Sequence, residues 1–215
     1  MKRFVLSFSL LFLSLVFYIS CNDEKPSIGA VVYNIVVDYN SSESKPDVRL
    51  SVFAETFSDV NRNHSVTLVN EESGMEWTCN KPSKLQDDTK KNWIGYTNFK
   101  SPSNGFFQKG TYIFRYKDLK ERDCEAKFLL DFDETLFNLS MNELLEKLPA
   151  NSKNKCVIYN NNNNVIFYGT KNERWNLKSE ILDDYEDFYS IRDVYFLPKN
   201  NTLFIMPLKH DFDLD

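Results

Sequence analysis

The chain has 215 residues, a formal net charge of −5 and 42% apolar residues. With 18 Phe and 11 Tyr but only 6 Gly and 7 Pro, it has enough apolar material for one large or two small domains and is not a low-complexity chain. The acidic balance disfavours nucleic acid and anionic lipid surfaces as partners.

The first twenty residues have the pattern of a secretory signal. Lys2 and Arg3 precede an apolar run from Phe4 to Ile19, and Ser20 is a small residue before a predicted cleavage site. The run is shorter than the roughly 20 apolar residues that span a bilayer, which favours a cleaved signal over a transmembrane helix. Without Lys2 and Arg3 the chain has 24 basic and 31 acidic residues, a net charge near −7.

Cys21 directly follows this signal. The stretch from Tyr18 to Cys21 resembles the lipobox of bacterial lipoproteins, although Tyr18 stands where that family usually has Leu. The resemblance implies that residues 1–20 are removed and that Cys21 is lipidated and anchors the protein to a bacterial membrane. The expected location is the outer membrane, the cell surface or the periplasmic face, with residues 21–28 as a short tether. An ordinary cleaved signal peptide, with Cys21 incidental, is the alternative.

Residues 29–133 predict an all-β domain. β-branched and aromatic residues cluster or alternate with polar residues, and turn-rich stretches separate these runs. Strands are predicted near residues 31–37, 48–52, 66–68, 75–79, 93–96, 110–116 and 126–130. About seven short strands in roughly a hundred residues favour a β-sandwich.

The run from Gly110 to Tyr116 resembles the penultimate strand of immunoglobulin-like and fibronectin-like domains, in which a tyrosine closes the preceding turn. This resemblance implies an immunoglobulin-like β-sandwich. The Cys–Trp–Cys spacing of antibody domains is absent from the chain. Similarity of fold alone implies no function.

Residues 134–215 predict a small α+β domain with the order helix–hairpin–helix–hairpin. Ser140 and Glu143 form a predicted capping box for the first helix. The remaining elements are expected at residues 156–168 (hairpin), 177–188 (helix) and 194–206 (hairpin). Aligning Glu143 with Glu180 brings the two halves nearly into register, 37 residues apart, which indicates a duplicated unit of two helices on four antiparallel strands. A coincidence of short elements is the alternative.

Four cysteines are present: Cys21, Cys79, Cys124 and Cys156. If Cys21 is lipidated, three remain and at least one is unpaired. Cys79 and Cys124 are a possible disulfide in an exported protein, and two free thiols are the alternative. Cys156 lies in an apolar run and is expected to be a small buried side chain.

The stretch from Lys127 to Leu136 resembles the first motif of haloacid-dehalogenase-like phosphohydrolases. By that resemblance Asp131 is the nucleophile and Asp133 the acid/base, with Mg²⁺ held between them and the substrate phosphate. Only 80 residues follow Thr135, too few for the parallel sheet of that family. The alternative is a last sandwich strand that ends in an acidic linker, and we expect no catalytic residues here.

Five aromatic residues lie in and after a long polar loop: Trp93, Tyr96, Phe99, Phe106 and Phe107. If exposed, they form a binding platform for a glycan or a protein; if buried, they belong to the core. The histidines are His64 in a polar turn and His210 near the C-terminus, and neither is expected to be a buried base. We find no zinc-type spacing and no Gly-rich nucleotide loop, so we expect no metal and no cofactor.

The sequence thus favours a lipid-anchored envelope protein that binds a protein or glycan and is not an enzyme. A structural or assembly lipoprotein of the envelope is the second hypothesis. A Mg²⁺-dependent phosphohydrolase that uses Asp131 and Asp133 is the third.

Overall fold

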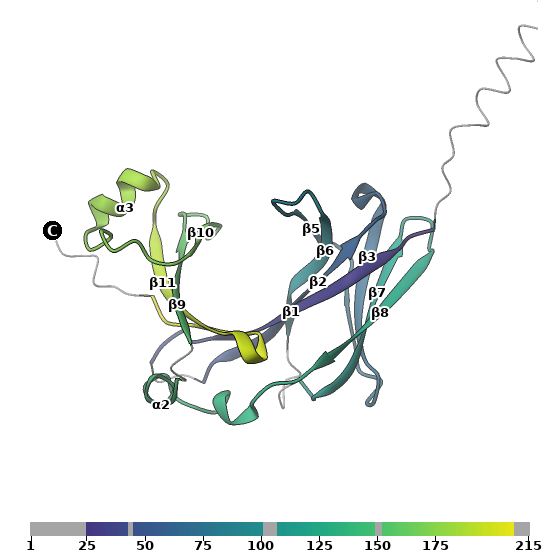
Figure 1. Cartoon of the computed structure of the whole chain (residues 1–215), viewed down its shortest axis with the longest axis horizontal. Coiled ribbons are helices and arrows are strands. Elements are labelled where there is room, and N and C mark those ends of the chain that lie inside the picture. Colours follow the sequence, from purple (N-terminus) through teal and green to yellow (C-terminus); the bar gives the residue numbers. More distant parts are fainter. Residues whose placement is uncertain (1–24, 43–44, 101–106, 149–151, 209–215) are drawn as a thin grey trace, which may run out of the picture.

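The computed structural model describes residues 25–42, 45–100, 107–148 and 152–208. In this part of the chain, half of the residues are in strands, which form two sheets, and there are two short α-helices (Figure 1). The fold is therefore mostly β, as the composition and the alternation predict. Cys21 and Phe106 lie outside the described residues.

The larger sheet has eight strands in the order β10-β9-β11-β12-β1-β2-β6-β5. Their bounds are β1 Ile28–Asp38, β2 Asp47–Thr56, β5 Ser83–Gln86, β6 Asn92–Lys100, β9 Lys153–Tyr159, β10 Val165–Gly169, β11 Ser190–Leu197 and β12 Thr202–Ile205. The β5 strand was not predicted, because its four residues are polar apart from Leu85 and lie in a stretch that reads as a loop.

The smaller sheet has four strands in the order β4-β3-β7-β8. Their bounds are β3 Asn63–Asn70, β4 Glu76–Cys79, β7 Gly110–Asp118 and β8 Asp123–Leu130. It packs against β1, β2 and β6, and fully buried residues from both sheets, such as Leu50, Ile94, Leu68 and Phe114, form one apolar cluster.

The helices are α2 Met141–Lys147 and α3 Lys178–Asp184, and three short 3-10 turns are η1 Val60–Arg62, η2 Glu134–Leu136 and η3 Pro198–Asn200. The capping box predicted for α2 is confirmed, since Ser140 accepts from the Glu143 backbone N–H and the Glu143 carboxylate accepts from the Ser140 N–H. The second helix is shorter than predicted and ends at Asp184.

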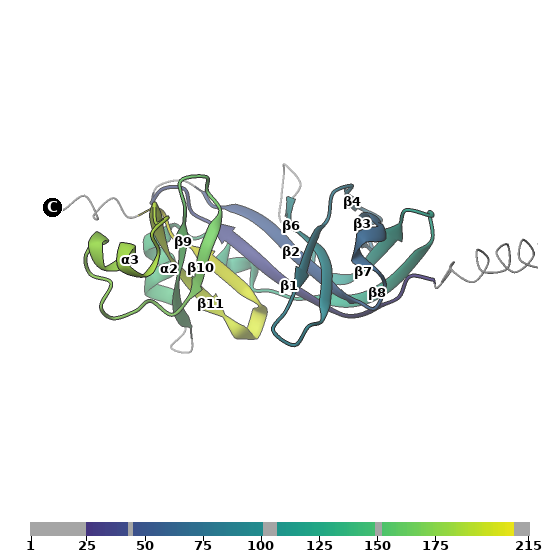
Figure 2. The same cartoon turned by 90° about the horizontal axis from the view of Figure 1, so that it is seen from above.

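A parallel pair, β1 with β12, joins strands from the two halves of the chain into one sheet. Ile35 lies opposite Thr202 and Asp38 opposite Ile205. All other strand pairs among the described residues are antiparallel. The sheet thus crosses the boundary predicted between residues 133 and 134, and β1 runs from one end of the molecule toward the other (Figure 2).

The eight-stranded sheet bends, so that one of its faces is concave (Figure 1). The convex face packs on the smaller sheet, on the segment around η2 and α2, and on α3. Within the described ranges, no helix or strand covers the concave face. Because alternate residues of a strand point to opposite faces, Val36 and Asp38 lie on the concave side and Ile35, Val37 and Tyr39 on the convex side.

The last four strands and the two helices repeat at an offset of 37 residues. Both ends of α2 and α3 differ by 37, and the buried residues Leu144 and Ile181 occupy equivalent positions. The pair Val157–Tyr168 between β9 and β10 is equivalent to the pair Val194–Ile205 between β11 and β12.

The pairing of β9 with β11 has the same offset. Its central pair joins Cys156 to Asp193, which are themselves 37 residues apart. A pseudo-two-fold axis through this pair therefore relates the two helix–hairpin units.

Two buried tyrosines of β7 differ in how their hydroxyl groups are satisfied. Tyr112 donates to the backbone carbonyl of Gln108 at 2.9 Å. The hydroxyl of Tyr116 is buried and has no hydrogen-bond partner among the described residues. Burial is the main reason that the pKa of Tyr116 is raised to about 12.

We predict opposite effects of removing these two hydroxyl groups. Tyr112→Phe should lower the free energy of unfolding by about 1–1.5 kcal/mol, because a buried hydrogen bond is lost. Tyr116→Phe should leave it unchanged or raise it, because an unsatisfied buried hydroxyl is removed. Urea denaturation of the two variants checks this, and equal losses would contradict it.

Candidate functional site

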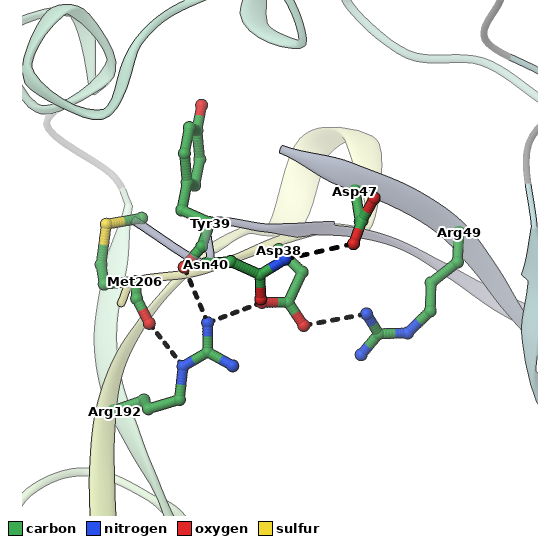
Figure 3. Close-up of polar contacts among 7 residues, drawn as sticks. All are labelled: Asp38, Tyr39, Asn40, Asp47, Arg49, Arg192 and Met206. Carbon is green, nitrogen blue, oxygen red and sulfur yellow. Dashed lines mark hydrogen bonds and ion pairs between the residues drawn. The ribbon is translucent and has the colours of Figure 1, made fainter. Parts of the chain in front are cut away.

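A polar network on the concave face joins side chains of β1, β2 and β11 (Figure 3). The Asp38 carboxylate lies between two guanidinium groups: Arg49 donates to one oxygen at 3.0 Å and Arg192 to the other at 2.6 Å. Both Asp38 and Arg192 are about 85% buried, so the pair is well shielded from water. One carboxylate shared by two arginines leaves one positive charge here.

Arg192 also bonds the backbone at the ends of β1 and β12. Its Nε donates to the Met206 carbonyl at 2.6 Å and its Nη2 to the Tyr39 carbonyl at 2.9 Å. These residues directly follow the last parallel pair, Asp38 with Ile205. The planar fork of the guanidinium group thus binds both chains at the point where the parallel ladder ends.

Tyr39 extends this network to the convex side. Its ring points away from Arg192 (Figure 3), is fully buried, and its hydroxyl donates to the Leu139 carbonyl at 3.0 Å, just before α2. Burial, and secondarily the charge of Glu143, raise the pKa of Tyr39 to about 12. The hydroxyl is therefore a permanent donor that fixes the approach to α2.

The floor of the concave face is apolar. Val36, Val157, Val194 and Ile205 are buried there although no helix or strand covers them. They are short, branched side chains on adjacent strands, and the taller side chains of Tyr159, Leu203 and Arg192 surround them. These residues form a buried apolar floor with the polar groups of Arg192 and Tyr159 at its border.

Lys155 lies beside this floor on β9. Its Nζ is 4.7 Å from the ring centroid of Tyr168 and 5.7 Å from that of Phe196. Such contacts are favourable cation–π interactions. No acidic partner of Lys155 is found in the described part of the chain.

The pseudo-two-fold axis relates Lys155 to Arg192 and Tyr159 to Phe196. The contact of Lys155 with Phe196 thus has as its counterpart the electrostatic interaction of Arg192 with Tyr159. Burial is the main cause of the raised pKa of Tyr159. The two cations and two aromatic rings form a repeated pattern, which we call the cation–aromatic centre.

The charge of this region differs in sign from that of the whole chain. Three cations, Arg49, Lys155 and Arg192, stand near two carboxylates, Asp38 and Asp47. Asp47 is exposed and accepts from the Asn40 amide at 3.2 Å (Figure 3). The concave centre is therefore weakly positive in a protein of net charge −5.

Of the five aromatic residues considered as a binding platform, the four that the structure describes lie in the core or at its border. Phe99 and Phe107 are 97% and 96% buried in the main core. Tyr96 is half-buried with its ring edge-on to Phe99, and the half-buried indole of Trp93 donates to Asp87 at 2.9 Å. These side chains therefore serve the core and its border.

Cys79, Cys124 and Cys156 are free thiols. Cys79 and Cys124 belong to one row of cross-strand neighbours, Cys79–Val66–Tyr116–Cys124, on the four strands of the smaller sheet. Three strand spacings separate them by about 14 Å. A disulfide requires Cα atoms within about 7 Å, so the possible bridge between Cys79 and Cys124 is not formed.

Asp131 and Asp133 follow β8, an edge strand of an antiparallel sheet, whereas the phosphohydrolase resemblance implies a parallel one. The exposed Asp131 pairs with Lys109 at 3.4 Å. Asp133 caps η2 by accepting from the backbone N–H and the hydroxyl of Thr135, and this hydrogen bonding lowers its pKa. Its carboxylate is thus occupied by a local structural contact.

The remaining candidate groups offer no activated nucleophile. Burial raises the pKa values of the Cys124 and Cys156 thiols to about 11, which keeps both protonated at neutral pH. His64 is exposed near Glu121. No group of three or more potential metal ligands occurs within the described ranges.

No family model matches this chain, and no curated protein matches it. The cation–aromatic centre was not identified from the sequence. Its signal was present, because the 37-residue offset aligns Lys155 with Arg192 and Tyr159 with Phe196.

We predict that Arg192 is the main contributor to stability in this network. Arg192→Ala should lower the free energy of unfolding by about 3 kcal/mol, because one oxygen of the buried Asp38 carboxylate and two backbone carbonyls lose a donor. Arg49→Ala should cost about 1 kcal/mol, since Arg49 bonds only to Asp38 among the described residues and is more exposed than Arg192. Urea denaturation measures both, and a smaller loss for Arg192→Ala than for Arg49→Ala would contradict the assignment.

Proposed function

We propose that this chain is a lipid-anchored protein of the bacterial cell envelope that binds an acidic partner polypeptide on its concave face. The observation that carries the proposal is the cation–aromatic centre: cations and aromatic rings around a buried apolar floor, with one lysine that has no acidic partner in the described residues. Aromatic rings and cations on a shaped surface are typical of recognition sites. A glycan partner is the competing outcome of the test below.

We further propose that the first part of the chain is an immunoglobulin-like sandwich. Two observations support this: the strand orders β1-β2-β6-β5 and β4-β3-β7-β8, and the bond from the Tyr112 hydroxyl back to Gln108. A tyrosine in this position of the penultimate strand, bonded to backbone a few residues upstream, is a feature of that architecture. Such domains present surfaces for partners, but the fold itself does not specify one.

The lipid anchor is proposed from the signal pattern and Cys21. In the described part of the chain, no helix is long and apolar enough to cross a membrane. Seven residues from Asn22 to Ile28 can span at most about 25 Å. In Figure 1, β1 begins at the end of the molecule farthest from β10. A short tether before β1 would therefore place the cation–aromatic centre on the side that faces away from the membrane.

The anchor predicts a lipid mass on Cys21. In a bacterial host, the full chain should gain two or three acyl chains, lose residues 1–20 and partition into detergent. Cys21→Ala should abolish the added mass and the partitioning. Intact-mass spectrometry and Triton X-114 phase separation measure this; an unmodified wild-type protein in the aqueous phase would contradict the anchor.

The binding surface predicts a preference for acidic probes. In fluorescence anisotropy, the detergent-solubilised chain should bind a labelled decapeptide of alternating Val and Asp at least fivefold more tightly than one of alternating Val and Asn. Lys155→Gln should remove most of this preference, whereas Lys90→Gln, in an exposed turn, should not. Tighter binding of an oligogalacturonate than of the acidic peptide would overturn the choice of a polypeptide.

A further inference from the structure

The strand β10 has one free edge. On its other side it pairs with β9, and within the described ranges no further strand pairs with it. The pseudo-two-fold axis relates β10 to β12, whose corresponding edge is filled by β1. The outer edge of the β11–β12 hairpin is thus occupied by β1, whereas the equivalent outer edge of the β9–β10 hairpin is open in the described residues.

The β12 edge shows how a strand joins this unit. The Ile35 N–H donates to the Asn201 carbonyl at 2.8 Å and the Tyr39 N–H to the Ile205 carbonyl at 2.9 Å. The added strand is parallel and places Asp38 opposite Ile205. Shifted back by 37 residues, Ile205 becomes Tyr168, whose carbonyl and N–H therefore face the open edge.

The charged residues correspond as well. Arg192 reaches past the end of β12 to bind Asp38 of the added strand. Its counterpart Lys155 lies over the ring of Tyr168, next to the place where an equivalent acidic side chain would arrive. A cation is therefore present at the open edge. Among the described residues, no carboxylate pairs with it in the way that Asp38 pairs with Arg192 at the filled edge.

The composition of β10 also differs from that of the other outer strand of the sheet. The sequence of β10, Val-Ile-Phe-Tyr-Gly, has no charge and no proline, whereas β5 carries Lys84. Charged residues, prolines and bulges are usual protections of an edge against added strands, and of these three β10 has only a bulge. A register shift between Val165 and Phe167 limits regular pairing to the last residues of β10, which predicts a short contact.

We propose that the open edge of β10 accepts an extended segment of a partner polypeptide, parallel to β10, with an acidic residue opposite Tyr168 that pairs with Lys155. This is strand addition, in which backbone bonds give affinity and alternate side chains give specificity. The inference rests on the proposed function, because it names the conformation of the acidic partner and the edge that it occupies.

The test uses a labelled peptide that copies residues 31–40, Val-Val-Tyr-Asn-Ile-Val-Val-Asp-Tyr-Asn, the strand that fills the equivalent edge. The detergent-solubilised full chain should bind it, and an Asp→Asn version of the peptide should bind three- to tenfold more weakly. Lys155→Gln should weaken binding of the acidic peptide by a similar factor. It should leave binding of the Asn version unchanged, because both changes remove the same ion pair.

Proline at the edge separates strand addition from a general attraction of charges. Tyr168→Pro should abolish binding because it removes an N–H that faces the open edge, whereas Tyr168→Val keeps that N–H and should retain most of the binding. Circular dichroism tests whether each variant is folded. If the proline variant misfolds, isotope-edited infrared spectra of a ¹³C-carbonyl peptide bound to the wild-type chain detect the added strand directly.

The outcomes distinguish the two proposals. Acidic peptides that bind Tyr168→Pro as tightly as wild type, or a labelled peptide without a strand signature, would overturn strand addition and leave acidic binding in place. Failure of the wild-type chain to bind any acidic probe would overturn both. Self-association of the chain that is lost in Tyr168→Pro would replace the partner polypeptide with a second copy.

Discussion

The continuous eight-stranded sheet depends on the bond network between Arg192, Asp38 and the chain ends beside them. The β1–β12 pair is parallel and covers only four residue pairs, so it offers few backbone bonds of its own. Arg192 adds two bonds to carbonyls and an ion pair with Asp38 at the end of that short ladder. Arg49 holds the same carboxylate from β2, which ties four neighbouring strands at one point.

This junction also explains the concave face. The convex side is occupied by the second sheet, by α2 and by α3, and Tyr39 attaches the segment before α2 to the end of β1. Since the apolar contacts lie on that side, the opposite face is left with short branched residues, and the arginines of the junction rise above them. One structural requirement, the connection of two halves through a short parallel pair, thus accounts for the arginines of the candidate site.

The sequence predicted most individual elements, because each depends on local pattern. Alternation located seven of the first eight strands, and the capping box of Ser140 and Glu143 located α2. The β1–β12 pair was not predictable in this way, because residues 28–38 and 202–205 are far apart in the chain and neither segment carries a local signal for its partner. The burial of Phe99 and Phe107 was not predictable for the same reason, because only tertiary packing determines that these two rings turn inward.

The difference between Arg192 and Lys155 agrees with the difference between the two edges. A guanidinium group donates in a fixed plane to several acceptors at once, which suits a permanent contact with Asp38 and two carbonyls. An ammonium group on a flexible stem can rest on the Tyr168 and Phe196 rings and move to a carboxylate when one arrives, at little cost in geometry. In this repeated unit, arginine stands where the neighbouring strand belongs to the same chain, and lysine stands at the edge where we propose that a partner strand binds.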